Sequence, residues 1–259
     1  MIPFILNWFG MAVHDVTAAS DFYNQKLGFS FVKDEKYGPW RYFQTRRMTF
    51  ELFQAHHDRP KVNAWGNGQA LRPVILVRDL SAAEALLRDQ GITHARLTSE
   101  FGSKIELTGP DEIRWGLMES PDVDMDWAHP VVGGIELKAS NLHAQKDFYT
   151  RVLGMTIEHE TDEVIHFKKP NGEAWLRIEA GGNPTPARMN EEKPAFFYPI
   201  WISYETSDVK RADAWIQQQK VTTLCPLTYH EDWKGTDIII SDADGNAIQL
   251  VQYGKPSDS

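Results

Sequence analysis

The sequence predicts an α+β protein in which four βαβββ modules follow one another along the chain. Two internal repeats support this prediction. Residues 21–29 (DFYNQKLGF) return as residues 147–155 (DFYTRVLGM), and residues 79–87 (DLSAAEALL) return in looser form as residues 208–216 (DVKRADAWI). A repeat at a fixed spacing indicates a duplicated architecture. Because the two shifts are nearly equal, 126 and 129 residues, the first and second modules recur together as the third and fourth.

In the first module, the repeated segment is typical of a helix end followed by a turn. Apolar residues at helical spacing precede Gly28, which can adopt the left-handed conformation that ends a helix. Asp15 or Thr17 is expected to cap the start of this helix. The predicted strands, with a turn at Arg46 and Arg47, are residues 8–14, 29–34, 40–45 and 48–54.

The other three modules repeat this order of elements. Gly91 is expected to end the second helix, and an Asn-Gly pair at residues 171–172 predicts a hairpin in the third module. Residues 56–71 and 180–199 are predicted loops. The predicted strands are residues 74–77, 104–107, 114–118, 134–139, 157–160, 164–168, 174–178, 201–204, 236–240 and 247–252, and the predicted helices are residues 81–90 and 209–219.

Composition and charge limit the classes of partner. The 259-residue chain has a net charge of -9 and scattered basic residues, so no basic stripe offers a surface for nucleic acid. No apolar run approaches the roughly 20 residues of a membrane span, and the apolar start lacks the basic flank of a signal peptide. The single cysteine, Cys225, excludes an internal disulfide. We therefore expect a cytoplasmic protein that binds neither nucleic acid nor a membrane.

The repeat also predicts how the chain divides into domains. Residues 119–130 contain four acidic residues and two prolines, which is typical of a linker. We expect a domain of two modules at residues 1–120, a linker at residues 121–131, and a second domain of two modules at residues 132–259. The sequence leaves open whether the protein forms a homodimer.

Two motifs in combination resemble those of a known superfamily. The first is F-Y-x-x-x-L-G-F/M after the first and third helices, and the second is D-A-D-G-N-A-I-Q-L-V-Q at residues 242–252. Along nearly its whole length the chain is similar to the glyoxalase, bleomycin-resistance and extradiol-dioxygenase superfamily, also called vicinal oxygen chelate. The resemblance implies two glyoxalase-like domains, in which paired modules form cupped mixed sheets that hold a small-molecule ligand in the concavity.

The resemblance also implies where a metal would bind. Superfamily members with chemistry bind a divalent metal through residues on the opening and closing strands of their modules. The corresponding residues here are Trp8, Arg72, Gly134 and Trp201 on opening strands, and Glu51, Gly116, Arg177 and Gln249 on closing strands. Only Glu51 and Gln249 are usual ligands, and they lie in different halves of the chain. Glu51 is expected to pair with Arg72 instead. We therefore expect no metal and no cofactor.

Other clusters of histidine and carboxylate side chains are weaker metal candidates. They are His56 with His57 and Asp58, His166 with Glu163, and His230 with Glu231 and Asp232. The first cluster lies in a predicted loop and the other two lie near the predicted rims of the cups. We interpret all three clusters as polar surface groups in preference to metal ligands.

The cup-facing positions of the second half indicate a small-molecule pocket. Strand alternation places aromatic and polar side chains where a plain core would have aliphatic ones. Arg177 would pair with a carboxylate, and Trp175 or Trp201 would stack on a flat ring. The predicted ligand-binding residues are Trp201, Arg177, Trp175, Gln249, Glu136 and Ser203. The alternative interpretation is that these charges form ion pairs on an open, wet sheet face.

We therefore predict a protein of this superfamily with degenerate metal positions, which binds a small aromatic or anionic molecule in the cup of its C-terminal half. The alternative function is a metal-dependent enzyme, similar to an extradiol dioxygenase or a lyase, whose ligands come from other positions. The sequence assigns no catalytic residue and leaves open whether the protein is an enzyme. Metal analysis separates the two hypotheses, because tightly held stoichiometric metal favours the enzyme.

Overall fold

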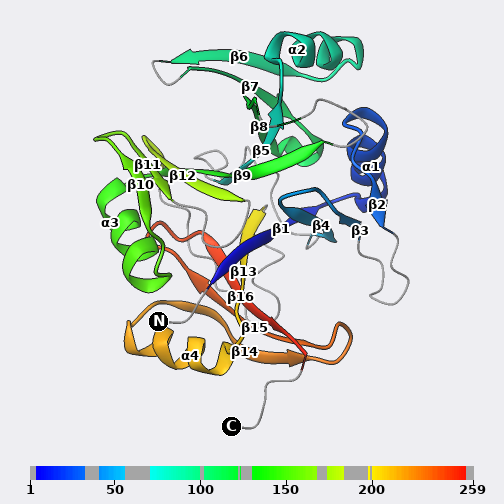
Figure 1. Cartoon of the computed structure of the whole chain (residues 1–259). Coiled ribbons are helices and arrows are strands. Elements are labelled where there is room, and N and C mark those ends of the chain that lie inside the picture. The colour runs from blue at the N-terminus through cyan, green and yellow to red at the C-terminus, as the bar shows by residue number, and fades with distance from the viewer. Residues whose placement is uncertain are drawn as a thin grey trace.

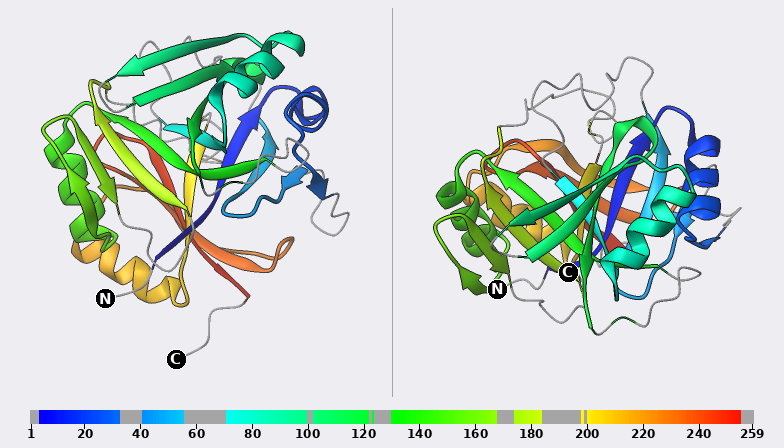
Figure 2. Two further views of the ribbon diagram at one scale, coloured as in Figure 1. Left: turned by 45° about the horizontal axis from the view of Figure 1, so that its top comes forward. Right: turned by 90° about the horizontal axis from the view of Figure 1, so that it is seen from above.

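In a computed structural model of the chain, two eight-stranded mixed sheets lie face to face, and the helices lie at the periphery (Figure 1). Figure 2 shows the same arrangement from two further directions, with the helices at its flanks. The structure describes residues 4–32, 41–55, 71–99, 102–121, 123, 130–167, 174–183, 198 and 200–254. The α+β class, the four modules and the cupped sheets that the sequence predicts are confirmed.

Sheet A has the strand order β14-β15-β16-β13-β1-β4-β3-β2. It therefore combines the first module with the fourth. Its strands are β1 (Ile5–Val13), β2 (Phe31–Val32), β3 (Arg41–Phe43), β4 (Thr49–Gln54), β13 (Ile200–Glu205), β14 (Thr223–His230), β15 (Gly235–Ser241) and β16 (Ala247–Tyr253). The two modules meet where β1 pairs with β13 in antiparallel register, with Gly10 opposite Trp201.

Sheet B has the order β10-β11-β12-β9-β5-β8-β7-β6 and combines the second module with the third. Its strands are β5 (Leu71–Val77), β6 (His94–Ser99), β7 (Gly102–Thr108), β8 (Arg114–Glu119), β9 (Val131–Ala139), β10 (Ile157–Glu160), β11 (Val164–Phe167) and β12 (Trp175–Ala180). The two modules meet where β5 pairs with β9, with Arg72 opposite Glu136.

This pairing corrects one expectation. The sequence predicts a cup in the C-terminal half, yet the third and fourth modules contribute their strands to different sheets. Each cup contains one module from each half, so no cup belongs to the C-terminal half alone. The division into residues 1–120 and 132–259 stays a prediction, and most of the expected linker at residues 121–131 lies outside the described residues.

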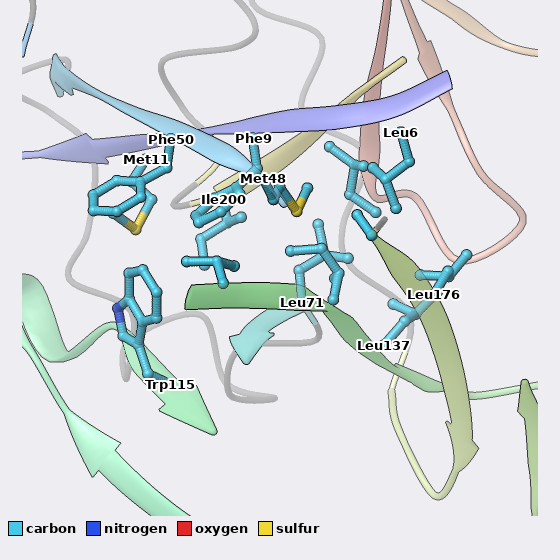
Figure 3. Close-up of a cluster of buried hydrophobic side chains, with 14 of the residues drawn as sticks. Leu6, Phe9, Met11, Met48, Phe50, Leu71, Trp115, Leu137, Leu176 and Ile200 are labelled. Carbon is cyan, nitrogen blue, oxygen red and sulfur yellow. The ribbon is translucent and has the colours of Figure 1, made fainter. Parts of the chain in front are cut away.

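The main hydrophobic core lies between the two sheets. Figure 3 shows Phe9, Met11 and Phe50 of sheet A pointing toward Leu71 and Trp115 of sheet B. All five side chains are at most 3% exposed. The ring centroids of Phe9 and Trp115 lie 5.8 Å apart with their planes at 66°. Burial of such large side chains contributes roughly 1.5–3 kcal/mol each, so this interface is a major source of stability.

The repeated segment forms the same local structure in the first and third modules. α1 (Val16–Asp21) and α3 (Leu142–Asp147) each continue into one π-helical turn, Phe22–Lys26 and Phe148–Val152. Gly28 and Gly154 follow with φ of 72° and 66°, which confirms the predicted left-handed helix end. Asp15 caps α1, since its side chain accepts a hydrogen bond from the backbone of Ala18 at 2.9 Å. The π-helical turn was not predicted.

The second and fourth modules carry the longer helices α2 (Leu80–Asp89) and α4 (Val209–Gln218), close to their predicted bounds. Two strands, β6 and β14, were not predicted. Both lie at a sheet edge, where half-solvated strands show weak apolar alternation, and β14 contains Pro226. Among the described residues, no helix is long and apolar enough to cross a membrane. The predicted turn at residues 171–172 and most of the predicted loops at residues 56–71 and 180–199 lie outside the described residues.

Candidate functional site

Each sheet has one face on the shared core and one face that points away from it. In β1, Phe9 and Met11 belong to the shared core, whereas the alternate residues Trp8 and Ala12 belong to a separate cluster. This is the period-two alternation expected of a strand with one buried face. We call the outward faces cup A, on sheet A, and cup B, on sheet B.

The six predicted ligand-binding residues do not share one cup. Trp201 and Ser203 on β13 and Gln249 on β16 lie in cup A, whereas Trp175 and Arg177 on β12 and Glu136 on β9 lie in cup B. Within each cup the structure does bring polar partners together. Ser203 Oγ donates a hydrogen bond to Gln249 Oε1 at 3.1 Å, and Arg177 Nη1 lies 3.5 Å from Glu136 Oε1.

The floor of cup B is a network of charged side chains centred on Glu136. This carboxylate, 2% exposed, lies within 3.5 Å of three cationic groups, on Arg72, Lys104 and Arg177. The network closes through Glu106, which pairs with Arg72, and through Glu179, which lies 2.9 Å from Arg177 and 3.4 Å from Lys104. Buried charges are tolerated only when they are paired in this way. The charged side chains at the floor of cup B therefore form ion pairs, but these are buried and do not lie on an open, wet sheet face.

The network also sets the charge states at its edge. Burial by itself would raise the pKa of Glu179, but Lys104 and Arg177 outweigh it and hold that pKa below its ordinary value. Burial, followed by repulsion from Arg177, lowers the pKa of His166 on the neighbouring strand. Glu179 is therefore ionised at neutral pH and His166 is biased toward its neutral form.

A cavity of about 470 Å³ lies over this network. Its charged lining includes Lys104, Lys138, Arg177, Glu106 and Glu179, and its apolar lining includes Leu97, Met118 and Val164. A volume of this size fits a small organic molecule. Trp175 is not part of this lining, because its indole lies against Gly134, where an added Cβ would be 2.6 Å from Trp175 Cδ2.

Aromatic side chains fill the floor of cup A. The indole of Trp201 lies flat on Gly10, where an added Cβ would stand only 2.0 Å from Trp201 Cζ2. Phe53 contacts Trp201 with ring centroids 5.0 Å apart, and Trp8 and Tyr198 belong to the same buried cluster. The absence of a side chain at Gly10 is therefore what allows the tryptophan to lie across the centre of the cup.

Beside this aromatic floor runs a chain of polar side chains. Ser203 donates to Gln249, the Gln249 amide donates to Asp237 Oδ2, and His230 Nε2 donates to Asp237 Oδ1 at 3.0 Å. Asp237 is 5% exposed, while the side chain of His230 is 33% exposed. The hydrogen bond from His230 to Asp237, its largest influence, raises the pKa of His230. The chain thus runs from the interior of cup A to its rim.

Glu51 is a separate acidic group in cup A. Burial raises the pKa of Glu51 to about 7. The expected ion pair with Arg72 is wrong, because Glu51 lies in sheet A and Arg72 in sheet B. Within the described part of the chain, the Glu51 carboxyl makes no hydrogen bond or ion pair. No partner among the described residues therefore offsets the partial desolvation of this carboxyl group.

Matching positions of the two cups carry opposite charges. Glu51 stands opposite Gly10 in β1, and 126 residues later Arg177 stands opposite Glu136 in β9. Likewise Asp237 on β15 corresponds to Lys104 on β7, with Val251 and Met118 as their register partners. At these two positions the repeat therefore preserves the backbone register but inverts the charge of the side chain.

The superfamily's metal positions can now be tested for fit. The structure unites Glu51 and Gln249 in cup A, which corrects the expectation that they are separated. The amide oxygen of Gln249, however, already accepts a hydrogen bond from Ser203, and the remaining two positions are the tryptophans. The four positions in cup B are Arg72, Gly116, Gly134 and Arg177. Neither set supplies three oxygen, nitrogen or sulfur ligands, so the residues do not fit a divalent metal.

The same conclusion holds for the other candidates. Among the described residues, no group of three His, Cys, Asp or Glu side chains is placed to hold a metal ion. Residues His56, His57 and Asp58 lie outside the described part of the chain. His166 faces Arg177 across paired strands, and His230 is engaged by Asp237.

Sequence reasoning missed Lys104, Glu106 and Asp237, which contribute to the two polar sites. A usable signal was present. Lys104 and Glu106 alternate with buried Ile105 and Leu107, and Asp237 precedes buried Ile238, so the same alternation places all three in the cups. What the alternation could not show is which strands of the other modules lie beside them.

Comparison with known proteins agrees with this architecture. The family model described as Glyoxalase/Bleomycin resistance protein/Dioxygenase superfamily matches residues 5–117 and 132–250. No curated protein matches the sequence.

Solved structures with the same fold include two enzymes or presumed enzymes. Glyoxalase I from Zea mays aligns at a TM-score of 0.71 and 14% identity, covering 96% of this chain and 92% of that one. A protein from Bacillus subtilis described as a putative dioxygenase aligns at a TM-score of 0.69 and 13% identity, covering 99% of this chain and 87% of that one. At such identities the likeness establishes the fold and leaves function to the residues of the cups.

Proposed function

Because the chain belongs to the glyoxalase/bleomycin resistance protein/dioxygenase superfamily, we propose that it uses a cup of this fold to bind a small molecule without a metal. The observation that carries the proposal is the Glu136 network, in which Arg72 and Arg177 stand at two of the four metal positions of cup B, beneath a cavity of about 470 Å³. The site is cup B, and it retains Arg177 and Glu136 from the predicted set.

The lining supports a ligand with an anionic end and an apolar body. Lys104, Lys138 and Arg177 offer cationic groups to the cavity, while Met118 and Leu97 offer apolar surface. A carboxylate could form a two-point contact with a guanidinium such as that of Arg177. An aromatic carboxylate combines these features, and it is the class of ligand that we propose.

The carboxylate of a bound ligand must compete with a carboxylate of the protein for Arg177. Glu179 lies 2.9 Å from Arg177 Nη2 and is 17% exposed, so it is the network carboxylate that a ligand could displace. Glu136 is only 2% exposed and has three cationic neighbours, so it is expected to stay in place. Displacement of Glu179 into solvent offsets part of the binding free energy, which favours affinities of moderate strength.

The proposal is tested with benzoate as the probe. Titration calorimetry of the full chain should detect binding, and Arg177→Met should weaken it about tenfold, as expected for the loss of a hydrogen bond to a charged group. The matched control is Arg151→Met, because Arg151 is half-exposed on the π-helical turn after α3 and pairs with Asp147 at 3.1 Å. Equal affinity in the two variants would remove cup B as the site.

The metal-dependent alternative is tested separately on the same preparation. Elemental analysis of the purified protein should find Fe, Mn, Ni and Zn well below one equivalent. One equivalent of any of them, retained through gel filtration, would contradict the metal-free proposal and favour the enzyme. This result is independent of the benzoate titration, so each measurement can fail without the other.

A further inference from the structure

The polar chain in cup A ends in a histidine that is oriented by a buried carboxylate. His230 Nε2 donates to Asp237 Oδ1 at 3.0 Å, and the other carboxylate oxygen accepts from the Gln249 amide. Gln249 is itself held by Ser203 at 3.1 Å. Each of these groups has its hydrogen-bonding direction set by the next, so the tautomer of His230 is determined. Nε2 carries the proton, and Nδ1 presents its lone pair when the ring is neutral.

We propose that His230 is the proton-accepting residue of a second site, at the rim of cup A, for a small molecule that presents a weakly acidic hydroxyl group. Asp237 is the positioning residue of this site. The proposal does not rest on the proposed function, because the two sites lie on different sheets.

The surroundings of His230 favour this role over a purely structural ion pair. A cross-strand pair that only joins β14 to β15 needs no further support, yet Asp237 also accepts a hydrogen bond from buried Gln249, which buried Ser203 holds in turn. His230 also stacks on Trp233, with ring centroids 4.9 Å apart and planes at 23°. The ring is thus held at two points while its side chain stays 33% exposed.

The backbone is adapted to hold this aromatic wall. Trp233 lies over Gly235, where an added Cβ would be 1.8 Å from Trp233 Cζ3. Tyr253, 53% exposed, contacts Trp233 edge-on with centroids 6.1 Å apart. A ligand that reaches His230 therefore meets a flat aromatic surface, which favours a planar ring bearing the hydroxyl group.

The proton transfer is balanced within the site. The ligand O–H bond breaks, its proton moves to Nδ1 of His230, and the electron pair of that bond stays on the ligand oxygen as an oxyanion. The product is an imidazolium bonded to the Asp237 carboxylate, which stabilises its positive charge. The charged groups that act on the ring are Asp237 from β15 and Asp232 from the β14–β15 turn, and both favour the imidazolium. No oxidant, reductant or metal enters the step.

The experiment uses 4-nitrophenol, whose absorbance reports whether its hydroxyl group is ionised. With wild-type protein in excess, the apparent pKa of the bound probe should fall by about one unit, the effect of one adjacent opposite charge. His230→Gln should abolish the shift. His143→Gln is the matched control, because His143 lies exposed on α3, and it should leave the shift intact.

Two further variants locate the effect and test the positioning role. Asp237→Asn removes the carboxylate that stabilises the imidazolium, so it should reduce the shift in the probe's apparent pKa. Asp237→Glu keeps a carboxylate and should restore most of that shift. If Asp237 were merely structural, its replacement would change only stability. Lys138→Met, which alters the cup B cavity, should leave the shift unchanged. The proposal is overturned if the wild-type protein leaves the probe's apparent pKa unchanged, or if His230→Gln retains the shift.

Discussion

The backbone N–H of Ser140 donates a hydrogen bond to Asp244 Oδ2 at 2.7 Å, and this contact ties the third module to the fourth. The first and second modules are joined in the same way, because the N–H of His14 donates to Asp111 Oδ2 at 2.6 Å. In both cases the donor follows an opening strand and the acceptor lies in the turn before a closing strand. These contacts therefore join the first module to the second and the third to the fourth across the two sheets, whereas the sheets themselves join the first module to the fourth and the second to the third.

Removal of this contact should destabilise the protein. Asp244→Ala leaves the Ser140 N–H without its charged acceptor, which should cost about 1.5–3 kcal/mol of unfolding free energy. Urea denaturation measures the change. Asp147→Ala is the control, since Asp147 is half-exposed and pairs, in the described part of the chain, only with Arg151 four residues later, and it should stay within about 0.5 kcal/mol of wild type. Equal losses in the two variants would contradict the role of the contact.

Gly10 should tolerate no side chain while Trp201 covers it. The added Cβ of Gly10→Ala would lie 2.0 Å from the Trp201 ring, and the resulting overpacking should cost about 1–3 kcal/mol. The double variant Gly10→Ala with Trp201→Leu removes the clash and should show a favourable coupling of at least about 1 kcal/mol in a double-mutant cycle. Additive losses would mean that the two residues do not contact each other in this way.

Glu51 should make stability depend on pH. Burial raises the pKa of Glu51 to about 7 in the folded protein, above its ordinary value of 4.5. The folded state therefore binds the Glu51 proton more tightly than the unfolded state. The stabilisation of the folded state by this proton is complete below pH 4.5 and is lost as the pH rises through 7. Relative to wild type, Glu51→Gln should gain about 1–3 kcal/mol of unfolding free energy between pH 5 and pH 8. The lower end of this range reflects partial solvent access to the Glu51 side chain.

Urea denaturation of both proteins at the two pH values tests this directly. The difference in unfolding free energy between Glu51→Gln and wild type should grow from pH 5 to pH 8. Glu84→Gln serves as the control, since Glu84 is partly exposed and pairs with Arg96 at 3.1 Å on the surface. A difference that stays constant with pH would show that Glu51 titrates at its ordinary pKa.

Glu136 should be among the costliest carboxylates to neutralise. Glu136→Gln leaves Arg72, Lys104 and Arg177 with one fewer counter-charge in a buried network, and loss of one partner of a buried ion pair costs about 3–5 kcal/mol. Glu160→Gln is the control, because its pair with Lys146 at 2.7 Å is exposed and should contribute less than about 1 kcal/mol. Thermal unfolding of the two variants, measured side by side, should rank them clearly. Similar melting temperatures would indicate that the network is solvated.

The fold was largely predictable because its signals are local. The helix stop at Gly28 and the alternation of Phe9 with Trp8 depend on residues that are close in sequence, and both predictions are confirmed. β6 and β14 were missed for the converse reason. Edge strands are half-solvated, so they bury too little to show a clear apolar pattern, and Pro226 argues against a strand.

The sequence by itself determined the four modules, the face on which each strand residue points, and the loss of the usual metal ligands at Arg72 and Trp201. Only the tertiary structure decided which modules share a sheet. The pairing of β1 with β13 places Trp201 in cup A, and the pairing of β5 with β9 places Arg177 in cup B. Backbone hydrogen bonds between strands are the same for almost any residue. The choice of partner therefore depends on how the whole core packs between the sheets, which no local pattern records.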